Sequence, residues 1–157
     1  YEPDDKGRVS IKKLYLDPFM DMWNLEILSY GISDRPSAQS IMTALNEAID
    51  ATNDCKFRRT FHSDRGWAYQ MVAYRQTLKS NRVFQSMSRK GNCYDNSPME
   101  NFFGIMKQEM YYGQVYSSFD ELKDAIEKYI RYYNQKRGKA SLGYRSPVEY
   151  REYMLAA

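Results

Sequence analysis

The sequence predicts one mixed α/β domain. The chain has 157 residues, a length that fits a single domain with its own hydrophobic core. Segments rich in the apolar and aromatic residues of strands alternate with segments that keep the 3.6-residue spacing of helices. The predicted order is strand, strand, helix, strand, helix, strand, helix, helix, which is an α/β pattern.

The N-terminal part predicts a strand hairpin. Residues 1–8 read as the end of an element followed by a turn. Residues 9–22 and 25–32 are rich in Val, Ile, Leu, Tyr and Met. The break between them falls at Trp23 and Asn24, and asparagine suits a hairpin turn. We therefore predict two antiparallel strands.

The middle of the chain predicts helices alternating with short strands. Residues 36–51 form a helix that begins near a proline and keeps helical spacing. A strand over 56–62, a helix over 67–80 and a strand over 82–87 follow. Residues 88–97 contain Gly, Asn and Asp and show no helical or strand periodicity, so we predict a loop.

The last third predicts helices. Pro98 opens a helix that runs to about residue 112, and residues 118–137 form a long amphipathic helix. A basic loop and a short helix after Ser146 and Pro147 end the chain. The apolar face of the long helix is predicted to contain Phe119, Leu122, Ile126, Tyr129, Ile130 and Tyr133.

Charge and composition exclude several classes of protein. The net charge of +3 permits a nucleic-acid partner without requiring one. With two cysteines, Cys55 and Cys93, and one histidine, His62, a four-ligand zinc site is effectively excluded. No apolar run approaches the roughly 20 residues of a membrane span, so we expect a cytoplasmic protein that does not enter the membrane.

Two acidic residues are the strongest candidates for chemistry. Asp64 follows a predicted strand, and Glu100 lies in the first turn of a predicted helix. Residues 65 to 99, 35 in all, separate them. Two carboxylates brought together can hold divalent metal ions, which can activate a hydroxyl and stabilise the leaving oxygen of a phosphodiester.

Each acid also has a structural interpretation. The string SPME, which ends at Glu100, is a capping box with proline at the first helical position. On composition alone, capping is favoured over metal binding by about two to one. Asp64 suits a turn before Gly66, and this role is about as well supported as a catalytic one.

Several basic residues are candidates for contacts with phosphate. Lys107 lies seven residues after Glu100, two helical turns along the same face. Arg89 and Lys90 lie in a loop of small and polar residues that suits close approach to a DNA backbone. The C-terminal part adds Arg131, Lys136, Arg137, Lys139 and Arg145. A solubilising role is the ordinary alternative for such charges.

Three strings, FHSDRGWAYQ, QSMSRKGNCYDNSPMENFFGIMKQEM and YIRYYNQKRGKASLGYRSPVEYR, resemble the integrase-type core of transposases of insertion sequence family three. KLYLDPFMDMWNLEILSYGISDRPSA is similar to the hairpin and first helix of that core. The resemblance covers nearly the whole chain, and the 35-residue gap is the family's hallmark. It implies a ribonuclease-H-like mixed sheet with flanking helices over about residues 1–112 and a C-terminal helical extension over about 113–157.

The resemblance assigns roles to single residues. Asp64 matches the second catalytic acid and Glu100 the third, which favours metal binding at Glu100 over capping alone. The implied cofactor is Mg²⁺ or Mn²⁺, with two ions in the intact enzyme. Lys107 matches a basic residue seven positions after the glutamate, and the implied DNA contacts are completed by Arg65, Arg89, Lys90, Asn96 and Arg137.

The family's first acid has no counterpart in this sequence. It lies in a Thr-Asp-x-Thr string on the first strand, and no such string is present. Asp21 matches an aspartate that is not catalytic, and Asp4 and Asp5 fall in the turn after the first strand. We expect the chain to begin a few residues after the missing acid, so that the central first strand is largely missing. The family's helix-turn-helix regions are also expected upstream or on a partner protein.

The leading functional expectation is therefore the core of a DNA transposase that cleaves and joins DNA strands. The alternative is an inactive remnant that binds DNA or transposase subunits, and a ribonuclease-H-like nuclease is a third, weaker interpretation. The expected partners are transposon ends, target DNA and further copies of the chain, in a bacterial cytoplasm at the nucleoid.

Overall fold

The structure is a computed structural model that describes residues 2–3, 9–10, 12–88 and 97–157. Its strands are β1 (Glu2–Pro3), β2 (Val9–Ser10), β3 (Tyr15–Met20), β4 (Ile27–Ser33), β5 (Thr60–Ser63) and β6 (Phe84–Met87). Its α-helices are α1 (Ala38–Ala51), α2 (Val72–Ser80), α3 (Ser97–Met106), α4 (Phe119–Gln135) and α5 (Pro147–Ala156). This order confirms the predicted mixed α/β fold.

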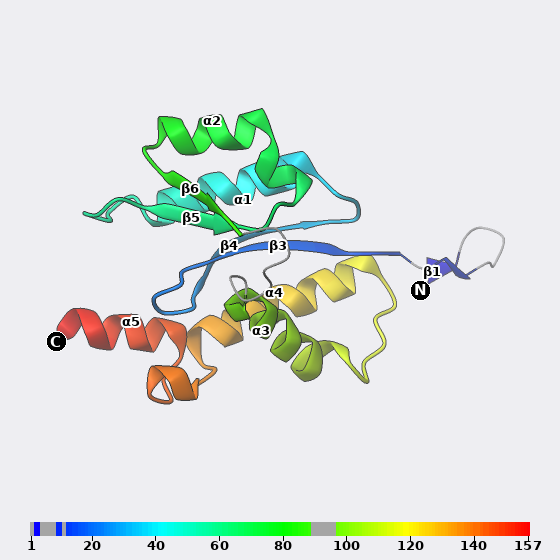
Figure 1. The fold of residues 1–157 in the computed structure, drawn as a ribbon. Coiled ribbons are helices and arrows are strands. Elements are labelled where there is room, and N and C mark those ends of the chain that lie inside the picture. The colour runs from blue at the N-terminus through cyan, green and yellow to red at the C-terminus, as the bar shows by residue number, and fades with distance from the viewer. Residues whose placement is uncertain (1, 4–8, 11, 89–96) are drawn as a thin grey trace.

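The strands pair in twos. β1 pairs with β2 and β3 with β4, both antiparallel, whereas β5 and β6 are parallel. Figure 1 shows the β3–β4 hairpin between two layers, with α1, α2, β5 and β6 on one side and α3 and α4 on the other. No helix in the described ranges is both long and apolar enough to cross a bilayer.

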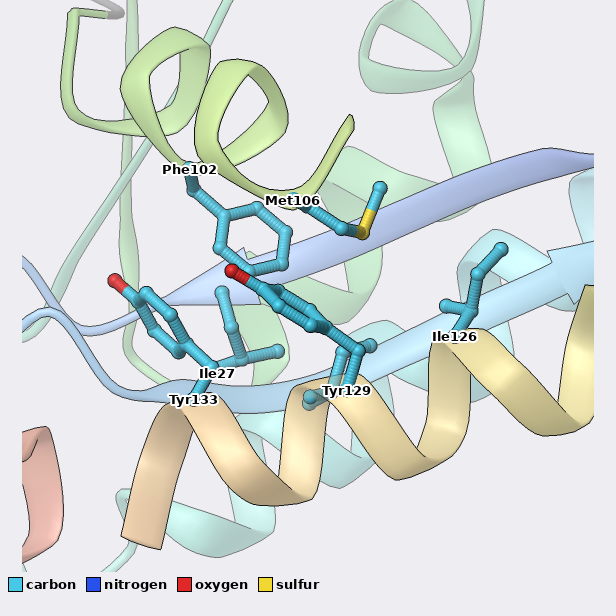
Figure 2. Close-up of a cluster of buried hydrophobic side chains, with 7 residues drawn as sticks. Ile27, Phe102, Met106, Ile126, Tyr129 and Tyr133 are labelled. Atoms are coloured by element: carbon cyan, nitrogen blue, oxygen red, sulfur yellow. The ribbon is translucent and has the colours of Figure 1, made fainter. Parts of the chain in front are cut away.

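Each side of the hairpin is covered by its own apolar cluster. The first cluster joins β4 to α3 and α4, and Figure 2 shows its labelled side chains pointing toward one another. Its buried members are Ile27, Phe102, Met106, Ile126, Tyr129, Ile130 and Tyr133. The four from α4 have the spacing i, i+3, i+4, i+7, which confirms the predicted apolar face.

The second cluster joins α1 and α2 to β5 and to Val83, the residue just before β6. Its buried members are Ile41, Leu45, Ile49, Ala68, Tyr74, Leu78 and Val83. Phe19 of β3 and Phe61 of β5 pack against it, with ring centroids 6.1 Å apart. The two clusters together hold the hairpin in the middle of the domain.

Several predicted boundaries differ from the structure. The predicted strand over 9–22 is two strands, because β2 pairs with β1 while β3 pairs with β4. The strand predicted over 56–62 starts only at Thr60, where its partner β6 begins. The first helix starts after Ser37, whose side chain accepts the Ser40 N–H at 3.2 Å, so Pro36 precedes the cap.

The helix predicted over 67–80 is broken. Residues 67–70 form a 3-10 turn, Met71 is extended, and α2 starts at Val72. In one continuous helix, residues five apart would point in different directions. The break lets the rings of Tyr69 and Tyr74 meet edge to face at 5.5 Å.

A side-chain amide of α4 takes the place of a strand partner for β4. The backbone N–H of Ile27 donates to Asn134 Oδ1 at 2.9 Å, and Asn134 Nδ2 donates to the Ile27 carbonyl at 2.9 Å. Ile27 is buried, so water cannot readily replace these two bonds.

We predict that Asn134→Leu lowers the free energy of unfolding by about 2–4 kcal/mol, because it leaves a buried N–H and carbonyl unpaired. Urea denaturation would measure the change. The control is Gln135→Leu, the same type of substitution at the next, exposed position, which should have little effect. Equal stability of the two variants would contradict the assigned role of Asn134.

An ion pair fastens the end of the α3 segment to α4. A π-helical turn, Lys107–Tyr111, continues α3. Within it, Glu109 accepts hydrogen bonds from Arg137 Nε at 2.9 Å and Nη2 at 2.6 Å, and from the Tyr129 hydroxyl at 2.8 Å. These hydrogen bonds lower the pKa of Glu109, and those from Arg137 have the largest effect.

We predict that Arg137→Ala lowers the free energy of unfolding by roughly 1 kcal/mol, since the pair is partly exposed and screened. Because the folded-state pKa of Glu109 is depressed, this stabilisation is present above its unfolded pKa and is lost as the pH falls through the folded-state pKa.

The check is chemical denaturation of both proteins between pH 7 and pH 3. Lys123→Ala is the control, because Lys123 meets Glu127 only at 3.9 Å on the surface of α4. A stability difference between wild type and Arg137→Ala that stays constant down to pH 3 would show that the ion pair is not its cause.

Candidate active-site cleft

A cleft of about 920 Å³ lies between β3 and β5. It is lined by consecutive residues of both segments, 16–22 and 59–64. Consecutive side chains of a strand point to opposite faces of a sheet, so a cleft along one face would be lined by every second residue. Because consecutive residues line this cleft, it borders the edges of the two strands. Among the described strands, β3 pairs only with β4 and β5 only with β6. The cleft therefore separates two unpaired edges.

Asp64 lies at the end of β5 and lines this cleft. Its Oδ1 accepts the backbone N–H of Gly66 at 2.7 Å, so the predicted turn role is real. A Cβ at Gly66 would lie 2.9 Å from the same oxygen, so a larger residue there would displace the carboxylate from this position. The hydrogen bond in this turn fixes the carboxylate of Asp64 through Oδ1, and Oδ2 takes no part in the turn.

Glu100 lines the same cleft from the first turn of α3. The helix begins at Ser97, within one residue of the prediction. Two acids that are far apart in the sequence thus line one cavity.

The same S-P-x-E pattern starts α5, where it is a true capping box. Ser146 N donates to Glu149 Oε2 at 2.8 Å, and Glu149 N donates to Ser146 Oγ at 3.3 Å. The hydrogen bond from the Ser146 backbone lowers the pKa of Glu149. The pattern therefore marks a helix start in both places and does not by itself distinguish a capping glutamate from a metal ligand.

Asp17, Asp21 and Asp54 also line the cleft, and sequence reasoning did not single out Asp17. Asp17, in the middle of β3, is partly buried there, and burial raises its pKa. Burial, together with the negative charges of Asp17 and Asp64, raises the pKa of Tyr69 to about 12. The signal in the sequence that could have identified Asp17 is a carboxylate within the apolar run of a predicted strand. Even so, no group of three or more His, Cys, Asp or Glu side chains suited to a metal ion occurs in the described part of the chain.

His62 connects the two parallel strands beside Asp64. Its ring nitrogens lie 3.0 Å from Ser86 Oγ and 3.0 Å from Ser88 Oγ. Arg65 Nε donates to the carbonyl of Ser88 at 3.1 Å. These bonds hold the end of β6 against the end of β5.

The candidate DNA contacts are spread over the molecule. Lys107 is exposed at the start of the π-helical turn, and it does not line the cleft. Arg137 also lies outside the cleft, and its guanidinium is bound by Glu109. Arg89, Lys90 and Asn96 lie outside the residues that the structure describes.

Comparisons with known proteins place the chain in a family. Two family models, each described as an integrase core domain, match residues 3–93 and 100–155. A putative transposase for insertion sequence element IS150 of Escherichia coli is 43% identical over 143 residues, covering 91% of this chain and 50% of that protein. A transposase-like protein of Haemophilus influenzae is also 43% identical, covering 91% and 65%. The chain thus spans about half to two thirds of these relatives.

Solved structures agree on the fold. The magnesium-bound catalytic core of HTLV-2 integrase, in its trimeric form, superposes with a TM-score of 0.62 at 13% identity, covering 88% of this chain and 91% of that one. The BIV integrase core gives a TM-score of 0.54 at 16% identity, covering 91% and 95%. The predicted ribonuclease-H-like fold is confirmed by these likenesses. The chain belongs to the integrase core family and is similar to transposases of the insertion sequence three type.

Proposed function

We propose that this chain forms the catalytic core of a transposase that cleaves DNA and joins the free end to a target strand. The observation that carries the proposal is the position of Asp64 and Glu100, which enter one cleft from different elements. Water, and then a DNA 3′-hydroxyl, would be the nucleophile. Catalysis of this kind depends mainly on the placement of charge around the phosphate.

Asp64 and Glu100 are suitable ligands for Mg²⁺ or Mn²⁺, because hard divalent ions prefer carboxylate oxygens. Bound ions would activate the hydroxyl nucleophile and stabilise the leaving oxygen. The protein's own contribution is to fix the ligands: the Gly66 N–H orients Asp64, and the first turn of α3 holds Glu100 at the cleft. Asp17 also lines the cleft, but no three-acid metal group forms among the described residues, so a third metal-binding carboxylate is still needed.

We propose that this third carboxylate comes from a strand that precedes residue 1 in the complete transposase and fills the cleft. Such a strand would give hydrogen-bond partners to the unpaired edges of β3 and β5. Its two faces would meet Ala48 and Tyr74 on one side and Met99 and Phe103 on the other, all of which line the cleft. A strand covered on both faces by apolar groups is expected to be apolar throughout, apart from the acid.

A binding remnant is the competing function for the chain by itself. The lack of a three-ligand metal group among the described residues favours it. The two functions differ in metal dependence. A catalytic site binds Mn²⁺ and loses it on Asp64→Asn, whereas a remnant binds DNA with an affinity that depends on salt but not on metal.

DNA and further copies of the chain are the proposed partners. The HTLV-2 core was solved in dimeric and trimeric forms, and a related core belongs to a simian viral intasome. Arg65 and Lys107 are the described candidates for phosphate contacts. Arg137 is expected to contribute less, because Glu109 neutralises its charge.

We predict that Glu100→Gln in the complete transposase reduces strand transfer by on the order of a hundredfold or more, since a charged ligand at the reaction centre is lost. The assay uses a pre-cut transposon end and a plasmid target. The matched control is Glu149→Gln, in the equivalent position of the S-P-x-E string of α5, which should retain strand transfer. Wild-type activity of Glu100→Gln would refute the metal-ligand assignment.

We predict that extending the chain by its upstream strand slows hydrogen exchange of edge amides in β3 and β5 by about tenfold or more, because they gain ladder partners. Mass spectrometry of the two chains would measure this at residues 16–22 and 59–64. Amides of α4 serve as the internal reference, since that helix lies outside the cleft. Identical exchange at both edges in the two chains would rule out a strand in the cleft.

A further inference from the structure

One face of the β5–β6 pair forms an exposed track that leads to Asp64. Along β5, Thr60 and His62 are exposed, whereas Phe61 and Ser63 are partly buried. Phe61 packs against the α1–α2 cluster, so the exposed residues lie on the face away from those helices. The register pairs Thr60 with Phe84 and His62 with Ser86, which places these side chains on the same face.

A stacked pair of side chains lies at the far end of this track. The guanidinium carbon of Arg58 is 4.7 Å from the centroid of the Phe84 ring. Phe84 is 49% exposed although it belongs to a strand. Within the described ranges, Arg58 forms no ion pair with a carboxylate. The pair thus presents a flat, positively charged surface to solvent.

The surroundings of the pair are basic. Lys56 and Arg82 are exposed beside Arg58 and Phe84 in the sequence. A guanidinium plane backed by an aromatic ring can stack on a nucleobase, and its N–H groups can bind phosphate. From Thr60 to Asp64 the track spans four residue-to-residue steps, about 13 Å at the rise of a strand. That length matches roughly four stacked nucleotides.

We propose that this face binds an unpaired DNA strand, with one base stacked on the Arg58 guanidinium and the strand continuing past His62 toward Asp64. An unpaired strand fits better than a duplex, because the face of a base is free for stacking on a side chain only when a neighbouring base has moved away. The direction toward Asp64 rests on the proposed function. The stacking contact itself requires neither metal nor catalysis.

The test measures binding of the complete transposase to a fluorescent oligo-dT strand and to a duplex of equal length, in EDTA, over a range of salt concentrations. Arg58→Ala is expected to weaken single-strand binding about tenfold and to reduce the salt slope by about 0.7. Arg58→Lys and Phe84→Leu should weaken it several-fold with the slope unchanged, because charge remains while stacking is lost. Duplex binding should change less in all three variants.

Two controls match these changes. Arg75→Ala removes an exposed arginine of α2, a helix on the other side of the sheet. Phe57→Leu replaces a phenylalanine that is 85% exposed but does not stack with Arg58. Both should bind the single strand as the wild type does. Circular dichroism confirms that each variant is folded, and Arg58→Lys carries the test if Phe84→Leu is unstable.

The proposal is overturned if Arg58→Lys and Phe84→Leu bind oligo-dT like the wild type. It is also overturned if Arg58→Ala weakens single-strand and duplex binding equally, because that result describes a phosphate contact without stacking. Failure of this proposal can be told apart from failure of the catalytic proposal. The binding test in EDTA examines stacking alone, whereas strand transfer by Glu100→Gln examines the catalytic assignment.

Discussion

The unpaired edges of β3 and β5 are the constraint on which the rest of the structure depends. Each strand has a single neighbour among the described strands, and the two free edges face one cleft. Backbone N–H and carbonyl groups along such edges require partners. The apolar clusters on both sides hold the two halves of the domain together around this gap. The cleft is therefore both the place where the sheet lacks strand pairing and the cavity that the acids line.

Local backbone chemistry decides how each acid is presented. Asp64 uses one oxygen to close a turn with Gly66, which orients the other. Glu149 uses its carboxylate to cap α5, and it lies outside the cleft. Glu100 has the same sequence context as Glu149, but α3 starts at the cleft. Whether an S-P-x-E glutamate lines the cleft thus follows from where its helix begins in space, which the string does not encode.

The sequence was sufficient for features governed by local periodicity. The hairpin, the apolar face of α4 and the helix that carries Glu100 were all predictable, because each depends on spacing within one segment. Features that depend on distant partners were not. The break at Met71 allows Tyr69 to meet Tyr74, and the capture of Arg137 by Glu109 joins two helices. Asp17 was missed because residues in the middle of a strand are expected to pack in the core, and functional side chains are expected at strand ends.

The distribution of cations bears on how the proposed DNA complex would be held. The net charge of only +3 gives a weak overall attraction to DNA, and the Arg137 guanidinium is already paired with Glu109. The proposed contacts would use exposed cations such as Lys107 and Arg58. Stacking, which salt screens little, is consequently an effective way for such a surface to retain a strand near the cleft.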